Sequence, residues 1–324
     1  MRAMTMSGAG GPEVLSLSEI ERPARVSSEL LVEVVAAGVN PIDAKTRAGR
    51  GPFAAIPAFP AVLGNDFSGV VVEAPYAAHP LQPGTEVYGM VAVPRLSGAY
   101  AQYLSVPSLS VVPKPSTLSH VEAAGVPVAA LTAWGMVVEI AKAHEGQRML
   151  IHAGAGGVGH FAVQFAAYFG AHVIATGSER NTSWLRELGA SEVIDYSTTR
   201  FEDAVRDVDA VIDLIGNVKD DTATRSLTVL RPGGIIVNGP SGSWPTMAQE
   251  AEAAGLRATG FQVAPNGSTL AIISRLLDSG DVRVHIDQVF DLADAAEAHR
   301  VIEEGHTRGK IVLRVSEGSA HPVR

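Results

Sequence analysis

The sequence contains no cysteine among its 324 residues. This absence excludes disulfide bonds, zinc sites with thiolate ligands and a cysteine nucleophile, and it leaves the redox state of the compartment unconstrained. The ten histidines form no HExxH motif and no closely spaced cluster. We therefore expect side chains such as His79 and His120 in the core or at the surface rather than on a metal ion.

The sequence also lacks a secretory signal and an uninterrupted membrane span. The N-terminal residues MRAMTMSGAGGPEV include no continuous apolar stretch. The most apolar long window, Met149 to Phe169, carries two histidines, a glutamine and several glycines, which a buried strand and helix explain better than a membrane span. We expect a cytoplasmic protein without a membrane partner.

Basic residues are in the minority, with 25 Lys and Arg against 34 Asp and Glu and a formal net charge of −9. On average, a surface of this sign does not attract nucleic acid or anionic lipid, so neither is expected as a partner. A hydrophobic content of 46% over 324 residues is typical of a folded chain long enough for two domains.

The most informative feature that is present is a glycine-rich segment, RMLIHAGAGGVG, at residues 148–159. An apolar run precedes its glycines and phenylalanines follow at helical spacing, which predicts a strand, a phosphate-binding turn and a helix. Gly154 allows a tight turn, Gly156 lets the backbone approach a pyrophosphate, and Gly159 lets the helix pack closely on its strand. The helix N-terminus adds N–H donors and a positive dipole end. The expected cofactor-binding residues of this turn are Gly154, Gly156, Gly157, Val158 and Gly159.

Strands and helices alternate from residue 148 onward, which predicts a doubly wound parallel sheet of the dinucleotide-binding type. Six strands are expected, at 148–153, 171–176, 192–195, 209–214, 234–238 and 256–259. Residues 1–118 instead predict a β-rich domain with strands at 30–36, 70–73 and 85–93.

At Ser119 the chain changes to an alanine-rich helical segment, and Ser119 with Glu122 forms a capping-box pattern. Residues 282–290 and GKIVLRV near the C-terminus again predict strands, with a helix between them. We assign residues 1–118 and 266–324 to one domain and residues 119–265 to a domain inserted into it.

Several motifs occur in an order that is more specific than any one of them: VNPIDAKTRAG, LGNDFSGVV, VPKP, LTAW, HAGAGGVG, LGASEVIDY and RGKIVL. In these motifs, over nearly its whole length, the sequence resembles the zinc-independent medium-chain dehydrogenase/reductase superfamily, in its quinone oxidoreductase branch. The resemblance implies an α/β protein in which a Rossmann NADPH-binding domain is inserted into a GroES-like β-rich catalytic domain. It further implies reduction of quinones or activated alkenes and a homodimer formed through the edge of the Rossmann sheet.

The resemblance bears on zinc as well. Zinc-using relatives carry a cysteine where this chain has Asn40, and a His-Glu pair where it has Asn65 and Asp66. The lobe of four cysteines that holds a structural zinc is also absent. We therefore expect no metal, which disfavours ordinary alcohol oxidation.

The end of the second strand of the inserted domain distinguishes NADP from NAD. NAD enzymes place an acidic side chain there for the ribose hydroxyl, and this chain reads Gly177-Ser178-Glu179-Arg180. Ser178 and Arg180 can hold a 2′-phosphate, and Tyr196 resembles a tyrosine that packs near the same phosphate. Glu179 is the alternative, because an inward carboxylate would favour NAD; Tyr196 can equally be an ordinary strand-end aromatic.

At the nicotinamide end, four residues fall at the carboxyl ends of strands or resemble family positions near the nicotinamide. Each glycine among them can equally be a simple turn residue. The four residues are Thr132, Gly216, Gly239 and Phe261.

For catalysis, Asn40 resembles the family asparagine near the nicotinamide, and its amide can donate to the oxygen that gains charge. Asp43 can organise the same loop or a water, or simply cap a helix. Many alkene-reducing relatives carry a tyrosine in a GxYP-like segment, where this chain has Phe53 and therefore no acid. Tyr100 and Tyr103 offer other hydroxyls but are expected to pack in the core.

The resulting hypothesis is an NADPH-dependent enzyme that transfers hydride to a quinone or α,β-unsaturated carbonyl compound without zinc. One alternative is an enoyl-thioester reductase, for which Arg47, Arg50 and Arg95 could form a basic entrance. Another is a catalytically silent NADPH-binding sensor or structural protein, since the phosphate turn is compatible with both.

Overall fold

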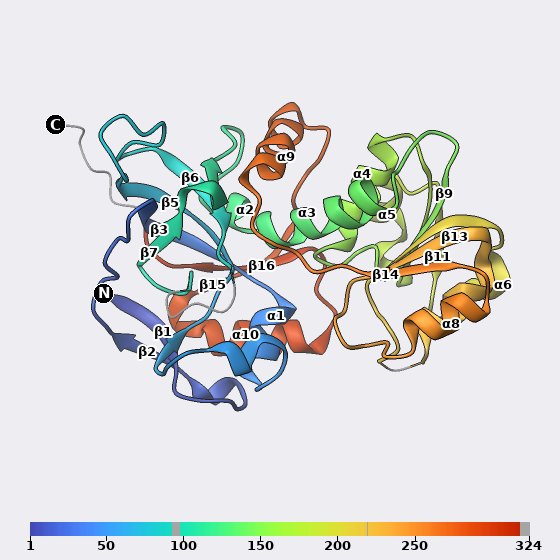
Figure 1. Cartoon of the computed structure of the whole chain (residues 1–324), viewed down its shortest axis with the longest axis horizontal. Coiled ribbons are helices and arrows are strands. Elements are labelled where there is room, and N and C mark those ends of the chain that lie inside the picture. Colours follow the sequence, from blue (N-terminus) through green and yellow to red (C-terminus); the bar gives the residue numbers. More distant parts are fainter. Residues whose placement is uncertain (93–97, 219, 318–324) are drawn as a thin grey trace. The chain divides into compact units, whose positions relative to one another are not determined.

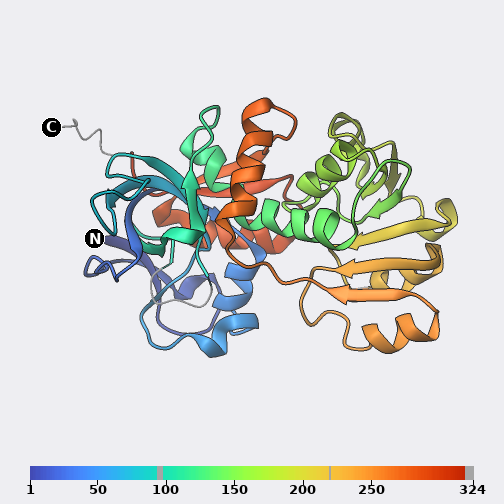
Figure 2. The same ribbon diagram turned by 45° about the horizontal axis from the view of Figure 1, so that its top comes forward.

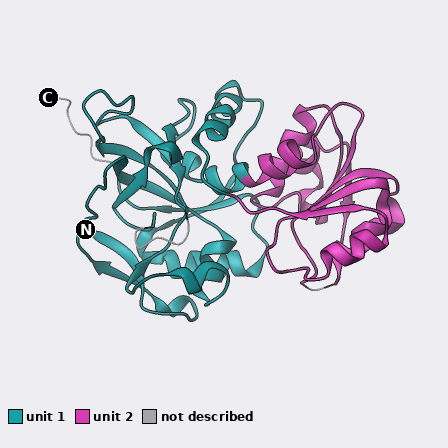
Figure 3. Cartoon of the chain, viewed as in Figure 1, with its two compact units in different colours: residues 1–131, 264–324 teal, residues 132–263 magenta. Residues whose placement is uncertain are grey.

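A computed structural model describes residues 1–92, 98–218 and 220–317 of the chain. The chain divides into two compact units (Figure 3): unit 1 comprises residues 1–131 and the described part of 264–324, and unit 2 comprises residues 132–263. The domain boundaries predicted from sequence lie at 118/119 and 265/266. Residues before 132 group with unit 1 because helix α2 (His120–Ala124) packs on strands β3 (Glu29–Val39) and β5 (Asp66–Glu73).

Unit 2 is a doubly wound parallel sheet, as the alternating pattern predicted. Its spatial strand order is β11-β10-β9-β12-β13-β14, and the neighbouring strands that pair are parallel. The strands are β9 (Arg148–Ile151), β10 (His172–Gly177), β11 (Glu192–Asp195), β12 (Val208–Asp213), β13 (Leu230–Asn238) and β14 (Arg257–Gly260). The order reverses between β9 and β12, which is where dinucleotide folds bind their ligand. The Rossmann prediction is confirmed.

Helices cover both faces of this sheet (Figures 1 and 2). Helices α4 (Gly159–Tyr168) and α5 (Thr182–Glu187) lie on one face, and α8 (Met247–Ala253) lies on the other. Two shorter helices, α6 (Phe201–Ala204) and α7 (Thr222–Ser226), connect further strands. Phe161 and Phe165 of α4 are fully buried, which is the reason for the helical spacing of phenylalanines seen in the sequence.

Unit 1 is built on a mostly antiparallel sheet, and the C-terminal part of the chain returns to it. Strand β16 (Lys310–Arg314) pairs antiparallel with β3 and parallel with β15 (Ile286–Asp291). Its remaining strands are β5, β6 (Glu86–Met90), β7 (Tyr103–Pro107) and β8 (Val111–Pro113). A smaller sheet contains β1 (Arg2–Met6), β2 (Leu15–Glu19) and β4 (Ala61–Val62). Its helices are α1 (Pro41–Arg47), α2, α9 (Gly267–Ser279) and α10 (Ala295–Glu304), with α3 (Pro127–Trp134) at the division.

This topology confirms that the nucleotide-binding sheet is inserted into a β-rich domain. The predicted strands 30–36 and 70–73 lie inside β3 and β5, and the predicted strand 85–93 contains β6, although Val93 lies outside the described residues. Nearly every residue of β3 is buried, because one face contacts the main core and the other lies under α2.

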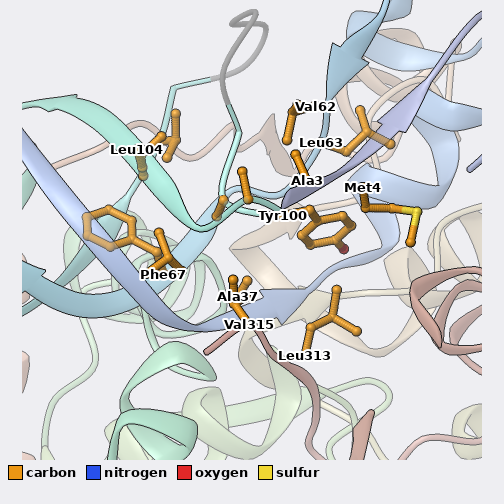
Figure 4. Close-up of a cluster of buried hydrophobic side chains, with 14 of the residues drawn as sticks. Ala3, Met4, Ala37, Val62, Leu63, Phe67, Tyr100, Leu104, Leu313 and Val315 are labelled. Carbon is orange, nitrogen blue, oxygen red and sulfur yellow. The ribbon is translucent and has the colours of Figure 1, made fainter. Parts of the chain in front are cut away.

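The main core of unit 1 lies between the sheets (Figure 4). Its fully buried side chains come from distant parts of the chain and include Met4, Phe67, Tyr100, Leu104 and Leu313. Burial of this apolar surface is the main favourable term that holds the return strand β16 in place.

We expect Phe67→Ala to destabilise the protein by roughly 3–5 kcal/mol, because Phe67 is fully buried and its removal leaves a cavity. The matched control is Leu109→Ala, whose side chain is 87% exposed and which should change stability by less than about 0.5 kcal/mol. Urea unfolding of both variants is the measurement. Equal losses for the two would show that this core does not stabilise the fold.

Candidate active site

The phosphate turn of unit 2 requires glycine at its last position. A Cβ on Gly159 would lie 2.1 Å from the backbone oxygen of Ala153, a distance that no real Cβ contact reaches. A Cβ on Gly156 would meet only this same oxygen within 4 Å, at 3.3 Å, so the outer side of the turn is open. A bound pyrophosphate can therefore approach the backbone at Gly156 and Gly157 and the start of α4 at Val158 and Gly159.

The tight turn itself has a different cause from the one predicted. The residue with a left-handed backbone is Ala153, with φ of 51°, whereas Gly154 has no positive φ. Glycine at 154 has another advantage, since a Cβ there would lie 3.1 Å from both Ala175 Cβ and Leu185 Cδ2, which is closer than most Cβ contacts. Glycine at 154 thus permits close packing against β10 and α5 rather than the turn.

A buried histidine braces the start of the turn. His152 is 1% exposed, and its Nδ1 lies 3.3 Å from Thr176 Oγ1 while its Nε2 lies 2.9 Å from Ser226 Oγ. Thr176 in turn accepts hydrogen bonds from the N–H groups of Ala153 and Gly154. Burial lowers the pKa of His152 to about 4, so the ring is neutral at pH 7 and serves the packing of the turn.

The residues predicted to hold a 2′-phosphate lie at the ends of two neighbouring strands. Ser178 follows β10 and accepts a hydrogen bond from Asn181 Nδ2 at 3.1 Å. Glu179 and Arg180 are both exposed in the short turn that follows. Tyr196 follows β11 and is 61% exposed, and its N–H donates to the Gly177 oxygen. The parallel pairing of β10 and β11 thus brings Ser178, Arg180 and Tyr196 to one edge of the sheet.

The glycines that follow β12 and β13 are both held by Asp213, one by its buried carboxylate and the other by its backbone oxygen. Asp213 accepts hydrogen bonds from the N–H groups of Ile215 and Gly216 and from Asn238 Nδ2. Gly216 has φ of +72°, and a Cβ there would lie 2.0 Å from Ser243 Oγ, so its backbone and its surroundings both require glycine. Gly239 follows β13 and donates its N–H to the Asp213 oxygen.

Phe261 and Thr132 lie near the same end of unit 2. The Phe261 N–H donates to the Asn238 oxygen, and its ring lies so close to Gly135 that a Cβ there would be 2.1 Å from Cζ. Gly135 begins a π-helical turn, 135–140, directly after α3, and Thr132 is half-buried one turn earlier on α3. Such π turns often occur at functional sites. Of the four residues predicted for the nicotinamide end, the two glycines and Phe261 thus follow β12, β13 and β14 in that order, and Thr132 precedes the π-helical turn.

Unit 1 contains a buried polar cluster around Asn40, which precedes α1. The Asn40 N–H donates to Asp43 Oδ2 at 2.9 Å, and Asn40 Nδ2 donates to Asp66 Oδ2 at 2.9 Å. Lys310 donates to Asn40 Oδ1, and its Nζ lies 3.5 Å from Asp66 Oδ2. Burial raises the pKa of Asp66 and lowers that of Lys310, and the attraction between the two opposes both shifts.

Asp43 lies in the capping box of α1 and connects this cluster to the core. Its Oδ2 accepts hydrogen bonds from Asn40 N–H and from Tyr100 OH, and Tyr100 OH also lies 3.3 Å from His299 Nε2. Burial raises the pKa of Asp43 to about 7, with a smaller contribution from the charge of Asp66. Burial lowers the pKa of His299 to about 3, helped by the positive charge of Arg47. Both roles considered for Asp43, loop organiser and helix cap, are consistent with these contacts.

The residues at the positions of the zinc ligands in zinc-using relatives, Asn40, Asn65 and Asp66, are poorly suited to binding zinc. Asn65 Nδ2 donates to the Val91 oxygen, and both ends of the Asn40 amide are hydrogen bonded to Asp66 and Lys310. A divalent cation on Asp66 would have to displace the Lys310 ammonium or be repelled by it. Over residues 1–92, 98–218 and 220–317, no group of three or more His, Cys, Asp or Glu side chains could hold a metal ion.

Other side chains considered from sequence lie away from this cluster or belong to the core. Arg47 is buried in an ion pair with Glu303 at 2.7 Å, so it does not form a basic entrance. Tyr103 stacks under Arg22, and Phe53 packs near Phe59. Arg50 is exposed, whereas Arg95 lies outside the described residues. His79 and His120 are buried and half-buried members of unit 1, as expected.

Sequence reasoning missed Lys310, Tyr100 and His299 as members of the polar cluster. A signal for Lys310 was present, because a lysine opens the otherwise apolar strand of RGKIVL. No short-range pattern connects Tyr100 to His299, since their contact depends on the return of the C-terminal segment to unit 1.

The fold and the phosphate turn define a dinucleotide-binding oxidoreductase. Family models describe residues 26–116 as an alcohol dehydrogenase GroES-like domain and residues 188–313 as a zinc-binding dehydrogenase. The chain is 32% identical to the NAD(P)H oxidoreductase RTN4IP1, mitochondrial, of Danio rerio, over 90% of this chain and 84% of the relative. It is 33% identical to the NADPH-dependent alkenal/one oxidoreductase, chloroplastic, of Arabidopsis thaliana, over 97% and 79% of the two chains.

Solved structures agree with these relatives. The quinone oxidoreductase from Coxiella burnetii superposes with a TM-score of 0.90 at 36% identity, covering 98% of this chain and 99% of that one. The chain therefore belongs to the medium-chain dehydrogenase/reductase superfamily, in the group of quinone oxidoreductases and alkenal reductases, and it is an oxidoreductase.

No helix in the described part of the chain is both long and apolar enough to cross a membrane. The predicted cytoplasmic location and the predicted homodimer stay predictions.

The buried carboxyl of Asp43 makes stability depend on pH in a defined direction. Its pKa is about 7 in the folded protein and 3.8 in the ordinary state, so its protonated form is stabilising below pH 3.8 and this contribution is lost as the pH rises through 7. Asparagine does not ionise, so only the wild type should lose stability as the pH rises. We expect the free energy of unfolding of Asp43→Asn to increase relative to that of the wild type from pH 4 to pH 8, by on the order of a few kcal/mol. Denaturation at several pH values measures this difference. A variant whose relative stability does not change with pH would contradict the raised pKa.

Proposed function

We propose that this chain transfers hydride from NADPH to a quinone or an α,β-unsaturated carbonyl compound without zinc. The observation that carries the metal-free part of the proposal is the contact of Lys310 Nζ with the side-chain oxygens of Asn40 and Asp66, two positions where zinc-using relatives carry other residues. A lysine in this contact opposes the binding of a cation at these two side chains. The relatives named above, a quinone oxidoreductase and an alkenal/one oxidoreductase, support the two acceptor classes.

NADPH, when bound, supplies the hydride and its pair of electrons. The open turn at Gly156 and the tight approach at Gly159 fit a pyrophosphate against backbone N–H groups. Ser178 and Arg180 hold the 2′-phosphate, with Tyr196 beside it. At the other end of unit 2, Thr132, Gly216, Gly239 and Phe261 position the nicotinamide.

Asn40 donates its side-chain N–H to the substrate oxygen as this oxygen gains negative charge. Asp43 fixes the backbone at Asn40, because its Oδ2 accepts the Asn40 N–H, and we assign it this positioning role. Phe53 cannot supply a proton. A quinone suits this arrangement best, since both reduced oxygens can take protons from water.

The arginine after β10 gives a test of the cofactor assignment. We expect Arg180→Ala to weaken NADPH binding about 10- to 100-fold, the effect of losing one charge-assisted hydrogen bond, and to leave NADH binding almost unchanged. Glu179→Ala is the matched control, because Glu179 is exposed in the same turn and should not affect NADPH. Isothermal titration calorimetry gives both affinities. Equal losses for NADPH and NADH, or a loss of NADH binding in Glu179→Ala, would refute the assignment.

The acceptor class is tested by following NADPH oxidation with 1,4-benzoquinone, an enone and a 2-enoyl-CoA. We expect kcat/KM for the quinone and the enone to exceed that for the thioester at least tenfold, or by about 1.4 kcal/mol. A higher kcat/KM for the thioester than for the quinone and the enone would favour the enoyl-thioester reductase. The structure gives that alternative less support, because Arg47 is buried in an ion pair and cannot form part of a basic entrance.

Two controls complete this experiment. Tight NADPH binding without turnover of any acceptor would replace the proposed enzyme with an NADPH-binding sensor or structural protein. Treatment with a chelator should leave the activity unchanged. Loss of activity with recovery on addition of zinc would overturn the metal-free proposal.

A further inference from the structure

The side chain of Lys310 is buried in a position where it contacts three oxygen atoms. Its Nζ donates to the Val39 oxygen at 3.1 Å and to Asn40 Oδ1, and it lies 3.5 Å from Asp66 Oδ2. An ammonium has three N–H donors and can donate to all three oxygens, whereas a neutral amine can donate to only two, so the contacts fit the charged form. Only 3% of Lys310 is exposed, and the negative charge of Asp66 compensates the cost of burying the ammonium.

The register of the sheet explains how Lys310 reaches this place. Strand β16 runs antiparallel to β3, with Ile311 opposite Val39, so Lys310 lies opposite Asn40 at the end of β3. The lysine therefore contacts the two consecutive residues Val39 and Asn40 at the point where the chain leaves the sheet and begins α1.

The contacts of the Asn40 amide give it one orientation. Oδ1 faces the ammonium of Lys310, and Nδ2 faces the carboxylate of Asp66. A rotated amide would place N–H groups against the ammonium and a carbonyl oxygen against the carboxylate, and both contacts would be repulsive. One hydrogen on Nδ2 is used by Asp66, so the direction of the other hydrogen is set as well.

We propose that Lys310 is a positioning residue of the reduction, which holds the Asn40 amide so that its second Nδ2 hydrogen points to the substrate oxygen. This inference rests on the proposed function, in which Asn40 is the donor. The ammonium also polarises the amide carbonyl, which strengthens Asn40 as a donor to an oxygen that becomes negative. A fixed positive charge thus acts on the reacting oxygen through one amide group.

The experiment is a double-mutant cycle of Lys310→Met and Asn40→Ala in the full chain, with kcat, KM and NADPH affinity measured for each variant. Methionine keeps the length of lysine but removes its charge and its donors. We expect each single variant to lower kcat about 10²- to 10³-fold, the usual loss for one donor to a developing oxyanion, with a much smaller change of KM. In the Asn40→Ala background, Lys310→Met should lower kcat less than twofold, because it acts through Asn40.

Two further measurements separate positioning from simple loss of structure. The phosphate turn is in unit 2, so the affinity for NADPH should change less than twofold in Lys310→Met and Lys310→Arg. Lys310→Arg keeps the positive charge and should recover at least tenfold of the kcat lost in Lys310→Met. If Lys310→Met alone does not fold, the charge-neutral pair Lys310→Met with Asp66→Asn replaces it and is compared with Asp66→Asn alone, because asparagine also alters the contact to Asn40 Nδ2.

Different failures have different meanings. If Lys310→Met lowers kcat by the same factor with and without Asn40, or leaves kcat unchanged in a folded protein, the positioning role is overturned and the proposed function is unaffected. If the wild type reduces acceptors but Asn40→Ala retains full kcat, Asn40 is not the donor and the inference is overturned with it. If the wild type reduces no acceptor, the proposed function itself has failed.

Discussion

The buried ion pair between Lys310 and Asp66 is the interaction on which the candidate catalytic end of unit 1 depends. It joins β16 to the end of β3 and to β5, and both of its partners contact the Asn40 amide. Removing one partner of such a pair is costly because the other charge remains buried. The pair therefore does more than stabilise the return of the C-terminal segment: it also limits Asn40 to one side-chain orientation.

Unit 2 meets a different constraint, which is steric rather than electrostatic. The backbone of the phosphate turn comes so close to itself at Ala153 and Gly159 that no side chain fits at position 159. The same requirement appears at Gly216, where the left-handed backbone and the nearby Ser243 both exclude a Cβ. In both places, the missing side chain keeps the backbone exposed at the carboxyl end of the sheet, where a dinucleotide is bound in folds of this type.

Much of this architecture could be predicted from sequence because it depends on local patterns. The six strands of unit 2, the phosphate turn and the return of the C-terminal strands follow from periodicity, glycine spacing and the order of motifs. The left-handed residue of the turn was not predictable, since glycine is the usual choice there and the structure uses Ala153. The buried cluster was missed for another reason. The lysine in an apolar strand is a signal that Lys310 is unusual, but its partners lie more than two hundred positions away and no local pattern identifies them.

The hydrogen bonds around Tyr100 bear on the source of the proton. A phenol has one hydrogen, and in this structure it is donated to Asp43 Oδ2. The contact between Tyr100 OH and His299 Nε2 can then be a hydrogen bond only if the histidine is the donor, which places the ring hydrogen of neutral His299 on Nε2. Because Tyr100 is fully buried and its hydrogen is already used, it is a structural residue rather than an acid. Phe53 cannot donate a proton either, so the preference for a quinone in the proposed function rests on the absence of an acid at these two side chains.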